Sequence, residues 1–436
     1  MTIRKELGED SLAFRTVRTA FACIWPRLAS DPTQALKRRP WADLLKQVYG
    51  REIDADALWF QHSYLVIVAK CIALAVMDLR EDDPAWLLLG EAFAAAGIHS
   101  AVESDFFDWV PADREGQALV GKLIAHVRRF RLAEVETDVL KILYESLIDQ
   151  DQRHGLGEYY TPDWLAAKIV RHAIDRPLEQ RVLDPACGSG TFLFHAVRRA
   201  SAEAEEARVK PVEQAPEVAR LVAGIDIHPV AVIVARVTYL LGLAPALKNR
   251  AGSLSIPVCL GDSLQRSVAH HLNESELRIA VPPPPAGAAP PDGHSAFNGK
   301  LREMLIFPET FCRDSELFDK AIERIRTASL EGLNREQVEA ALVRITEQHD
   351  KADLTDEQAR AIRDLGATYS LMDRLRREAR DTIWAYVARN LSRPLAFASG
   401  SGWANVLVGN TPWVAFRHMA DELQKAFKEL AKGEKV

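Results

Sequence analysis

The stretch from Arg181 to Leu193 joins a short apolar run to a turn with two glycines and then to the start of a helix. Val182 and Leu183 show no polar alternation, as in a central parallel strand covered on both faces. Gly188 and Gly190 allow positive φ and the close approach of a ligand. The helix start favours an anionic or hydrogen-bonding ligand group. Taken alone, the stretch fits an ordinary strand-to-helix turn equally well.

The composition indicates a soluble, cytoplasmic protein with no membrane segment. The chain has 436 residues, 48% hydrophobic and 27% charged, which is enough for two or three domains. Its five cysteines lie far apart in the sequence, and no metal-ligand spacing occurs, so neither a disulfide framework nor a metal site is expected. No signal peptide is recognisable. The longest apolar run, Tyr64 to Met77, contains Lys70 and is too short to span a bilayer, so it predicts a buried helix.

The formal net charge of −6 limits how the chain could bind nucleic acid. Proteins that bind nucleic acid alone usually carry a basic surplus, because phosphate contacts dominate their affinity. Any DNA affinity must therefore come from a local patch or a partner. Two arginine-rich segments, 128–131 and 374–380, are candidate patches, but their pattern is more typical of a solvated helix face.

Hydrophobic periodicity divides the chain into four regions. Residues 1–150 have helical spacing throughout and no catalytic arrangement, which predicts a helical scaffold or docking domain. Residues 151–281 alternate strands with helices, and residues 282–400 begin with a proline-rich linker and continue as a helical insertion. Residues 401–436 return to the sheet with one strand and one helix. The fold class is therefore α/β, with a doubly wound parallel sheet.

Three of the predicted strands end in an acid: Asp184, Asp226 and Asp262. An acid at the second strand end commonly binds ribose hydroxyls, and one at the third could accept from the exocyclic amine of adenine. Asp226 follows Asp184 at more than the usual spacing of about 20 residues. We therefore expect a longer helix between them or an added loop around residues 209–216. The three acids predict a site for an adenosine-containing cofactor.

The fourth predicted strand is followed by Asn410, Thr411, Pro412 and Trp413. Pro412 has no N–H and forces Thr411 to be extended, so the Asn410 amide oxygen and the Thr411 carbonyl form a pair of acceptors. Two acceptors can hold an –NH2 group, and an aromatic ring such as Trp413 can stack on a flipped base. The alternative is a simple turn.

A further segment, Glu158 to Leu165, has the signature of a helix start. Thr161 is a suitable N-cap, Pro162 fits the first helical position, and Asp163 suits the positive end of the helix dipole.

Together, Gly157 to Pro162 (GEYYTP), Asp184 to Gly190 (DPACGSG) and Gly409 to Trp413 (GNTPW) resemble the N6-adenine DNA methyltransferases of restriction–modification and phage-defence systems. The resemblance covers residues 140–265 and 400–420. It implies a Rossmann-like core that uses S-adenosyl-L-methionine, and double-stranded DNA with a flipped adenine as substrate.

The resemblance also implies roles for individual residues. Thr161 and the 184–190 loop would contact the methionine part of the cofactor, Asp226 its ribose and Asp262 its adenine. The target adenine would be held by Asn410, Thr411, Pro412 and Trp413. The full cofactor set comprises Tyr160, Thr161, Pro162, Asp184, Pro185, Ala186, Cys187, Gly188, Ser189, Gly190, Asp226, Ile227, Asp262 and Ser263.

The chain departs from that family in two respects. Thr411 replaces the first proline of the usual Asn-Pro-Pro-Trp, which we expect to weaken preorganisation without removing the site. The sequence also stops where the family's sheet would continue towards a target-recognition domain, so we expect a fragment or a second polypeptide that completes it. Two alternatives are a catalytically inactive assembly or DNA-recognition subunit, and an enzyme that methylates a protein glutamine or an RNA base.

Overall fold

The computed structural model describes residues 2–31, 55–80, 83–130, 138–147, 161–247, 249–261, 276–281, 303–378, 384–398 and 403–411, with isolated positions between and after them. The chain forms two compact units, which are described separately. One comprises Met1–Ser263 with Ala404–Val436, and the other Leu264–Trp403.

The N-terminal part of the first unit is built around one buried helix, α4 (Asp56–Val76). Its surroundings are α1 (Ile3–Leu7), α2 (Leu12–Leu28), α5 (Pro84–Leu88), α6 (Glu91–Ala95), the 3-10 turn η1 (Val110–Ala112), α7 (Arg114–Val127) and α8 (Val139–Leu147). The most apolar window of α4 is long enough for a membrane span, but 83% of it is buried inside the protein. The predicted buried helix is therefore confirmed, and α4 is the core of this region.

One short strand interrupts the helical region. β1 (Ile98–His99) pairs in parallel with β4 (Leu254–Ser255), which lies far along the chain. The prediction that residues 1–150 are helical throughout was wrong here, because a two-residue strand has no periodicity of its own to detect.

The sheet of the first unit is parallel and has the order β5-β3-β2-β8. Its strands are β2 (Val182–Asp184), β3 (Val222–Asp226), β5 (Val258–Leu260) and β8 (Val406–Leu407). Val182 pairs with Val222 on one side and with Val406 on the other, so the last described strand lies directly beside the first. The α/β class with a parallel sheet is confirmed.

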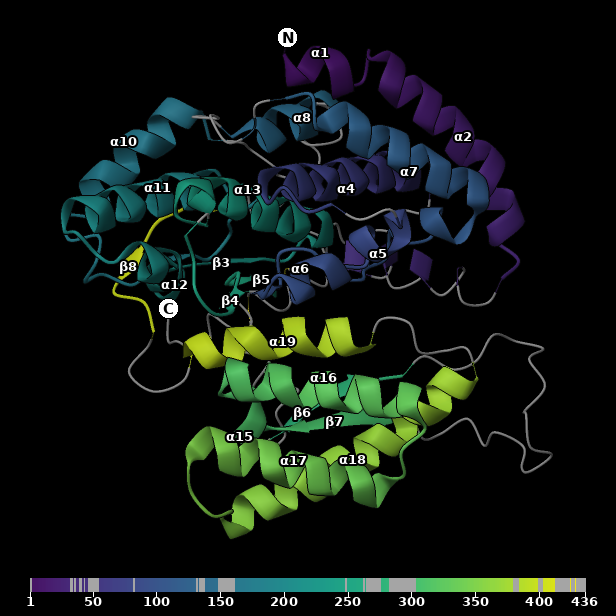
Figure 1. Cartoon of the computed structure of the whole chain (residues 1–436), viewed down its shortest axis with the longest axis vertical. Helices are drawn as coiled ribbons and strands as arrows, with labels where there is room; N and C mark the ends of the chain where they lie inside the picture. Colours follow the sequence, from purple (N-terminus) through teal and green to yellow (C-terminus); the bar gives the residue numbers. More distant parts are fainter. Residues whose placement is uncertain are drawn as a thin grey trace. The chain divides into compact units, whose positions relative to one another are not determined.

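Four helices accompany this sheet: α10 (Asp163–Ala173), α11 (Thr191–Glu206), α12 (Pro211–Leu221) and α13 (Pro229–Leu247). Figure 1 shows α10, α11 and α13 on one side of the strands, with α13 next to α4. The most apolar window of α13 is 94% buried, because α11 covers one flank and α4 another. The helical N-terminal region and the sheet thus share a core.

Two local predictions need correction. The wide spacing between Asp184 and Asp226 arises from a second helix, α12, which begins at Pro211, rather than from a longer helix or an added loop. Helix α10 begins at Asp163 with Pro162 as its N-cap, one residue later than predicted. Pro162 is extended (ψ 136°), and its carbonyl accepts from Leu165 and Ala166.

The second unit contains an antiparallel strand pair that the helical pattern did not predict. β6 (Glu276–Ala280) pairs with β7 (Met304–Pro308), with Leu277 opposite Phe307. The helices are α15 (Glu309–Cys312), α16 (Ser315–Glu331), α17 (Arg335–Asp350), α18 (Asp356–Arg377) and α19 (Trp384–Ala398). They enclose an apolar core that includes Phe307, Ile322 and Leu365.

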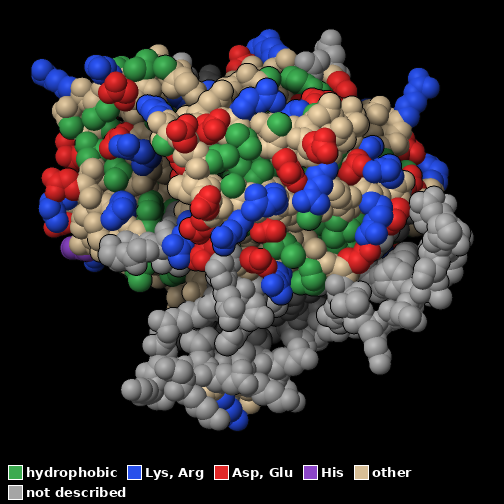
Figure 2. Space-filling view, turned by 90° about the horizontal axis from the view of Figure 1, so that it is seen from below, with side chains coloured by type: hydrophobic (Ala, Val, Ile, Leu, Met, Phe, Trp, Pro, Cys, Tyr) green, Lys and Arg blue, Asp and Glu red, His purple; other side chains and the backbone are tan. Residues whose placement is uncertain are grey.

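The face of the protein in Figure 2 is mixed in charge. Basic and acidic side chains are interspersed on the face in Figure 2. In the candidate patch near the end of α18, Arg374 pairs with Glu303, and Arg376 and Arg377 pair with Asp373. These ion pairs favour a solvated helix face over a phosphate-binding patch.

Candidate cofactor and catalytic site

The turn after β2 folds over the end of β3. The backbone N–H of Cys187 donates to the carbonyl of Ile225 at 2.9 Å. One residue later, the N–H of Gly188 donates to Oδ2 of Asp226 at 2.8 Å. Oδ1 of Asp226 accepts from the N–H of His228, also at 2.8 Å. The two motifs recognised in the sequence therefore meet through direct hydrogen bonds.

The glycines of the turn are required by its geometry. Gly188 has φ 53° and Gly190 has φ 95°, both in the left-handed region. A Cβ atom on Gly190 would lie 3.1 Å from Cα of Ala235 in α13, so this position also needs glycine for close packing. Gly190 is the N-cap of α11, and its carbonyl accepts from Phe194 at 2.8 Å. The predicted strand–turn–helix is confirmed.

Asp184 is a buried carboxylate with spare acceptor capacity. Its side chain is fully buried, and Oδ1 accepts from the N–H of Ala186 at 3.2 Å. Oδ2 has no hydrogen-bond partner among the described residues. Burial, together with the nearby charge of Asp226, raises the pKa of Asp184 to about 8. Burial also raises the pKa of Asp226, opposed by the N–H groups of His228 and Gly188. A cationic group beside Asp184 would favour the ionised carboxylate and lower its pKa.

Strand β8 brings Asn410 and Thr411, the described part of the predicted catalytic element, to the carboxyl ends of the neighbouring strands. The N–H of Val408 donates to the carbonyl of Leu183 at 3.1 Å, so the chain leaves β8 alongside the end of β2. A Cβ atom on Gly409 would lie 2.5 Å from Oδ1 of Asp184. Asn410 follows and is half-buried, and Thr411 is exposed. Residues 184 and 410 are thus brought together by the strand order.

Several predicted residues lie outside the described part of the chain: Tyr160, Asp262, Pro412 and Trp413. Thr161 and Ser189 are buried, and Ile227 is half-buried directly after Asp226. Ser263 is exposed.

Sequence reasoning missed two residues that connect these segments. Asp138, which stands before α8, accepts from the hydroxyl of Thr191 at 2.9 Å and from that of Ser189 at 3.5 Å. Lys141, in the first turn of α8, donates through Nζ to the carbonyl of Thr161. Burial raises the pKa of Asp138 to about 6, against the hydrogen bonds from Lys141 and Thr191. The available signal was an acid three residues before a lysine at a helix start, which is common on helices that carry no site.

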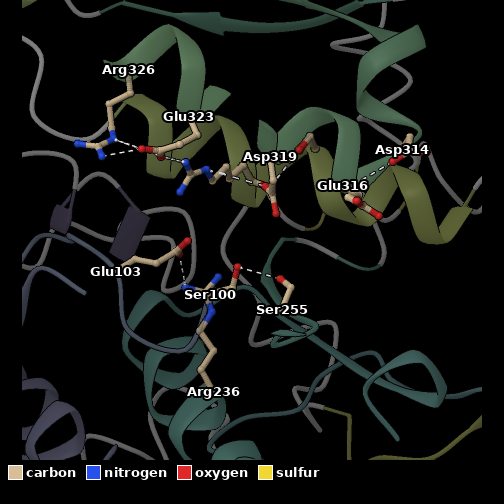
Figure 3. Close-up of polar contacts among 11 residues, drawn as sticks. Ser100, Glu103, Arg236, Ser255, Asp314, Glu316, Asp319, Glu323 and Arg326 are labelled. Carbon is tan, nitrogen blue, oxygen red and sulfur yellow. Dashed lines mark hydrogen bonds and ion pairs between the residues drawn. The ribbon is translucent and has the colours of Figure 1, made fainter. Parts of the chain in front are cut away.

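The N-terminal region is also bonded to the segment that contains β4 and β5. Glu103 forms an ion pair with Arg236 of α13 at 2.9 Å, and Nε of Arg236 donates to the carbonyl of Val258 in β5 at 3.0 Å. Ser255 donates to Ser100 at 3.2 Å, next to the β1–β4 pairing. Figure 3 shows the contacts between Glu103 and Arg236 and between Ser100 and Ser255. Glu103 and Ser100, both from the N-terminal region, therefore help to hold the segment that contains β4 and β5 in place.

Comparison with known proteins finds matches to DNA methyltransferases over part of the chain. Residues 135–270 match the family described as N-6 DNA Methylase. A segment of 69 residues is 33% identical to the Type II methyltransferase M.VspI from Vibrio sp. (strain 343), covering 16% of this chain and 17% of that protein. The resemblance to N6-adenine DNA methyltransferases of restriction–modification type is confirmed for this segment. The family match over residues 135–270 includes Asp138, Asp184 and Asp226 but ends before Asn410.

Two solved structures are similar over a larger part of the chain. The ATP-dependent Type ISP restriction–modification enzyme LlaBIII bound to DNA aligns with a TM-score of 0.36 and 14% identity, over 58% of this chain and 17% of that one. The Type IIL restriction–modification enzyme MmeI in complex with DNA aligns with a TM-score of 0.28 and 15% identity, over 55% and 41%. This chain therefore spans less than half the length of each of these relatives.

Proposed function

With residues 135–270 matching the N-6 DNA methylases, we propose that this protein is part of an S-adenosyl-L-methionine-dependent DNA methyltransferase that modifies adenine at N6. The observation that carries the proposal is the meeting of three strand ends. Asp184 and Asp226 lie at the ends of the neighbouring strands β2 and β3. Asn410 follows β8, which pairs with the other side of β2. The proposed core is a Rossmann-like methyltransferase fold.

The proposed cofactor site uses the two acids differently. Asp184 offers an oxygen without a partner among the described residues, which suits the positively charged methionine end of the cofactor. Asp226 is already oriented by the N–H groups of Gly188 and His228, which suits an acid that holds the two ribose hydroxyls. Asp262 remains the predicted contact to the adenine.

The proposed catalytic step needs only positioned acceptors. The amide oxygen of Asn410 and the carbonyl of Thr411 would accept from the two N–H bonds of the target amine, and Trp413 would stack on the base. Bound S-adenosyl-L-methionine would supply the methyl group to the nitrogen that these two acceptors hold and would leave as a neutral thioether. The methylated amine would then release one proton to solvent.

The proposed partners are double-stranded DNA and a polypeptide segment that completes the sheet. β8 is at the edge of the described sheet, and Leu407 on it is 68% exposed. An exposed leucine on a parallel edge strand favours a further covering element, which a target-recognition region or a second subunit would supply. We also propose a cytoplasmic location and a role in a restriction or phage-defence system.

Methyl transfer tests the proposal. The protein, together with any segment or subunit that completes it, is incubated with radiolabelled S-adenosyl-L-methionine and DNA, and the digested product is analysed. We expect N6-methyl-2′-deoxyadenosine from DNA treated with the wild type and a loss of at least a hundredfold in the Asn410→Ala variant. Label in RNA or in glutamine would instead identify a different substrate. Cofactor binding without transfer to any of them would identify an inactive assembly subunit.

A further inference from the structure

Asp138 collects hydrogen bonds from three separate parts of the first unit. It is 2% exposed and stands immediately before α8. Its carboxylate accepts from the hydroxyl of Thr191 at 2.9 Å and from the N–H of Lys141 at 2.9 Å. The hydroxyls of Ser189 and Thr238 lie 3.5 Å from its oxygens. An ionised carboxylate can only accept, so every donor here points at Asp138.

Lys141 extends this arrangement to the segment before α10. It is buried, and its ammonium donates to the carbonyl of Thr161. Two residues later, Oδ1 of Asp163 accepts from His195 of α11 at 3.1 Å and from the N–H of Asp138 at 3.5 Å. The start of α8 is thus bonded both to residues 161–163 and to the turn at residues 189–191.

We propose that Asp138 and Lys141 are positioning residues for the cofactor. They fix the Thr161 segment relative to the Ser189–Thr191 turn, the two segments that the proposed function assigns to the methionine end of S-adenosyl-L-methionine. The inference rests on that proposed function. Because the hydroxyls of Ser189 and Thr191 are directed to Asp138, these two residues meet a ligand through their backbone groups. Asp138 and Lys141 would act on the cofactor through other residues, since the side chains of both are already hydrogen-bonded within the protein.

The chemistry of the two positions makes the substitutions informative. Asn at position 138 keeps the shape of the side chain but replaces one acceptor oxygen with a donor, which opposes the donors around it. Met at position 141 keeps the length of the lysine but leaves the Thr161 carbonyl without its donor. Arg at position 141 still presents N–H donors.

The experiment titrates S-adenosyl-L-methionine into the full chain and follows binding by calorimetry, with thermal melting of each variant. We expect Asp138→Asn and Lys141→Met to weaken binding at least tenfold, and Lys141→Arg to recover most of the affinity. The exposed controls Asp175→Asn and Lys122→Met should bind like the wild type. In an active complex, the first two variants should raise KM for the cofactor more than they lower kcat.

The outcomes separate the two proposals. A folded wild type that does not bind the cofactor contradicts the proposed function. A wild type that binds, with Asp138→Asn and Lys141→Met binding equally well, overturns the positioning role. If Asp138→Asn does not fold, Thr191→Val removes the 2.9 Å hydrogen bond at nearly constant volume. Weaker binding in that variant supports the role, and unchanged binding overturns it.

Discussion

Gly409 passes so close to Asp184 that a Cβ atom on the glycine would lie 2.5 Å from Oδ1 of the carboxylate. Side chains do not approach this closely, so a larger residue must displace either the acid or the strand end. Asn410 is the next residue in the chain. The proposed cofactor acid, Asp184, and the proposed catalytic asparagine, Asn410, are therefore linked through one glycine.

We predict that Gly409→Ala weakens cofactor binding roughly tenfold, which corresponds to about 1.4 kcal/mol. The added methyl group would shift the Asp184 carboxylate, which is proposed to bind the methionine end of the cofactor. Equilibrium binding of S-adenosyl-L-methionine measures the effect. Gly121→Ala is the matched control, because a Cβ atom there would meet nothing within 4 Å. Equal affinity in the wild type and Gly409→Ala would show that the close approach has no bearing on the cofactor.

We predict that cofactor binding depends on the ionisation of Asp184. Burial raises its pKa to about 8, so at pH 6 the acid is mostly protonated. A cationic ligand binds the ionised form, lowers its pKa and releases a proton. Affinity should therefore rise between pH 6 and 7.5, by at most tenfold per pH unit. The rise should disappear in Asp184→Asn, and an identical rise in both proteins would assign the titration to another group.

The strands and their acids could be predicted from sequence because each signal is local. Val182 and Leu183 form an apolar run that ends in an acid, and the runs before Asp226 and Asp262 have the same form. Glycines with a required positive φ then fix the turn between β2 and α11. Such signals need no knowledge of which segments meet.

The remaining features depend on contacts between segments that are distant in sequence. β1 exists only because β4 lies beside it, and β6 only because β7 does. In the sequence, Asp138 looks like any acid before a helix, and only the folded structure shows its hydrogen bond from Thr191. The sequence also suggested that Lys70 merely breaks an apolar run, whereas the structure buries it completely.

We predict that Lys70→Met strongly destabilises the protein. Nζ of Lys70 lies 2.7 Å from Oδ1 of Asp108 and 2.9 Å from Oδ2 of Asp105, and all three side chains are buried. Removing the Lys70 ammonium takes away the cation that both buried carboxylates contact, which costs about 3–5 kcal/mol. Urea unfolding measures the loss. Arg80→Met is the control, since Arg80 and its partner Asp78 are both exposed, and its midpoint should barely move.

We predict that a truncated chain beginning at residue 148 aggregates. Helix α13 packs against α4, and removing the N-terminal helices exposes an almost entirely apolar helix to water. Size-exclusion chromatography of the purified protein measures the effect. Co-expression of residues 1–147 should restore a soluble complex. A monomeric and cooperatively folded truncated chain would show that the two regions are independent.

Calorimetric titration of S-adenosyl-L-methionine into the wild type and Asp226→Ala tests the account most directly. Asp226 is held by two N–H groups at 2.8 Å at the end of β3, where the cofactor ribose is proposed to bind. The account predicts one saturable site in the wild type, binding at least a hundredfold weaker in Asp226→Ala, and wild-type binding in the exposed control Asp175→Ala. A folded wild type that does not bind, or an Asp226→Ala variant that binds as tightly, would contradict it.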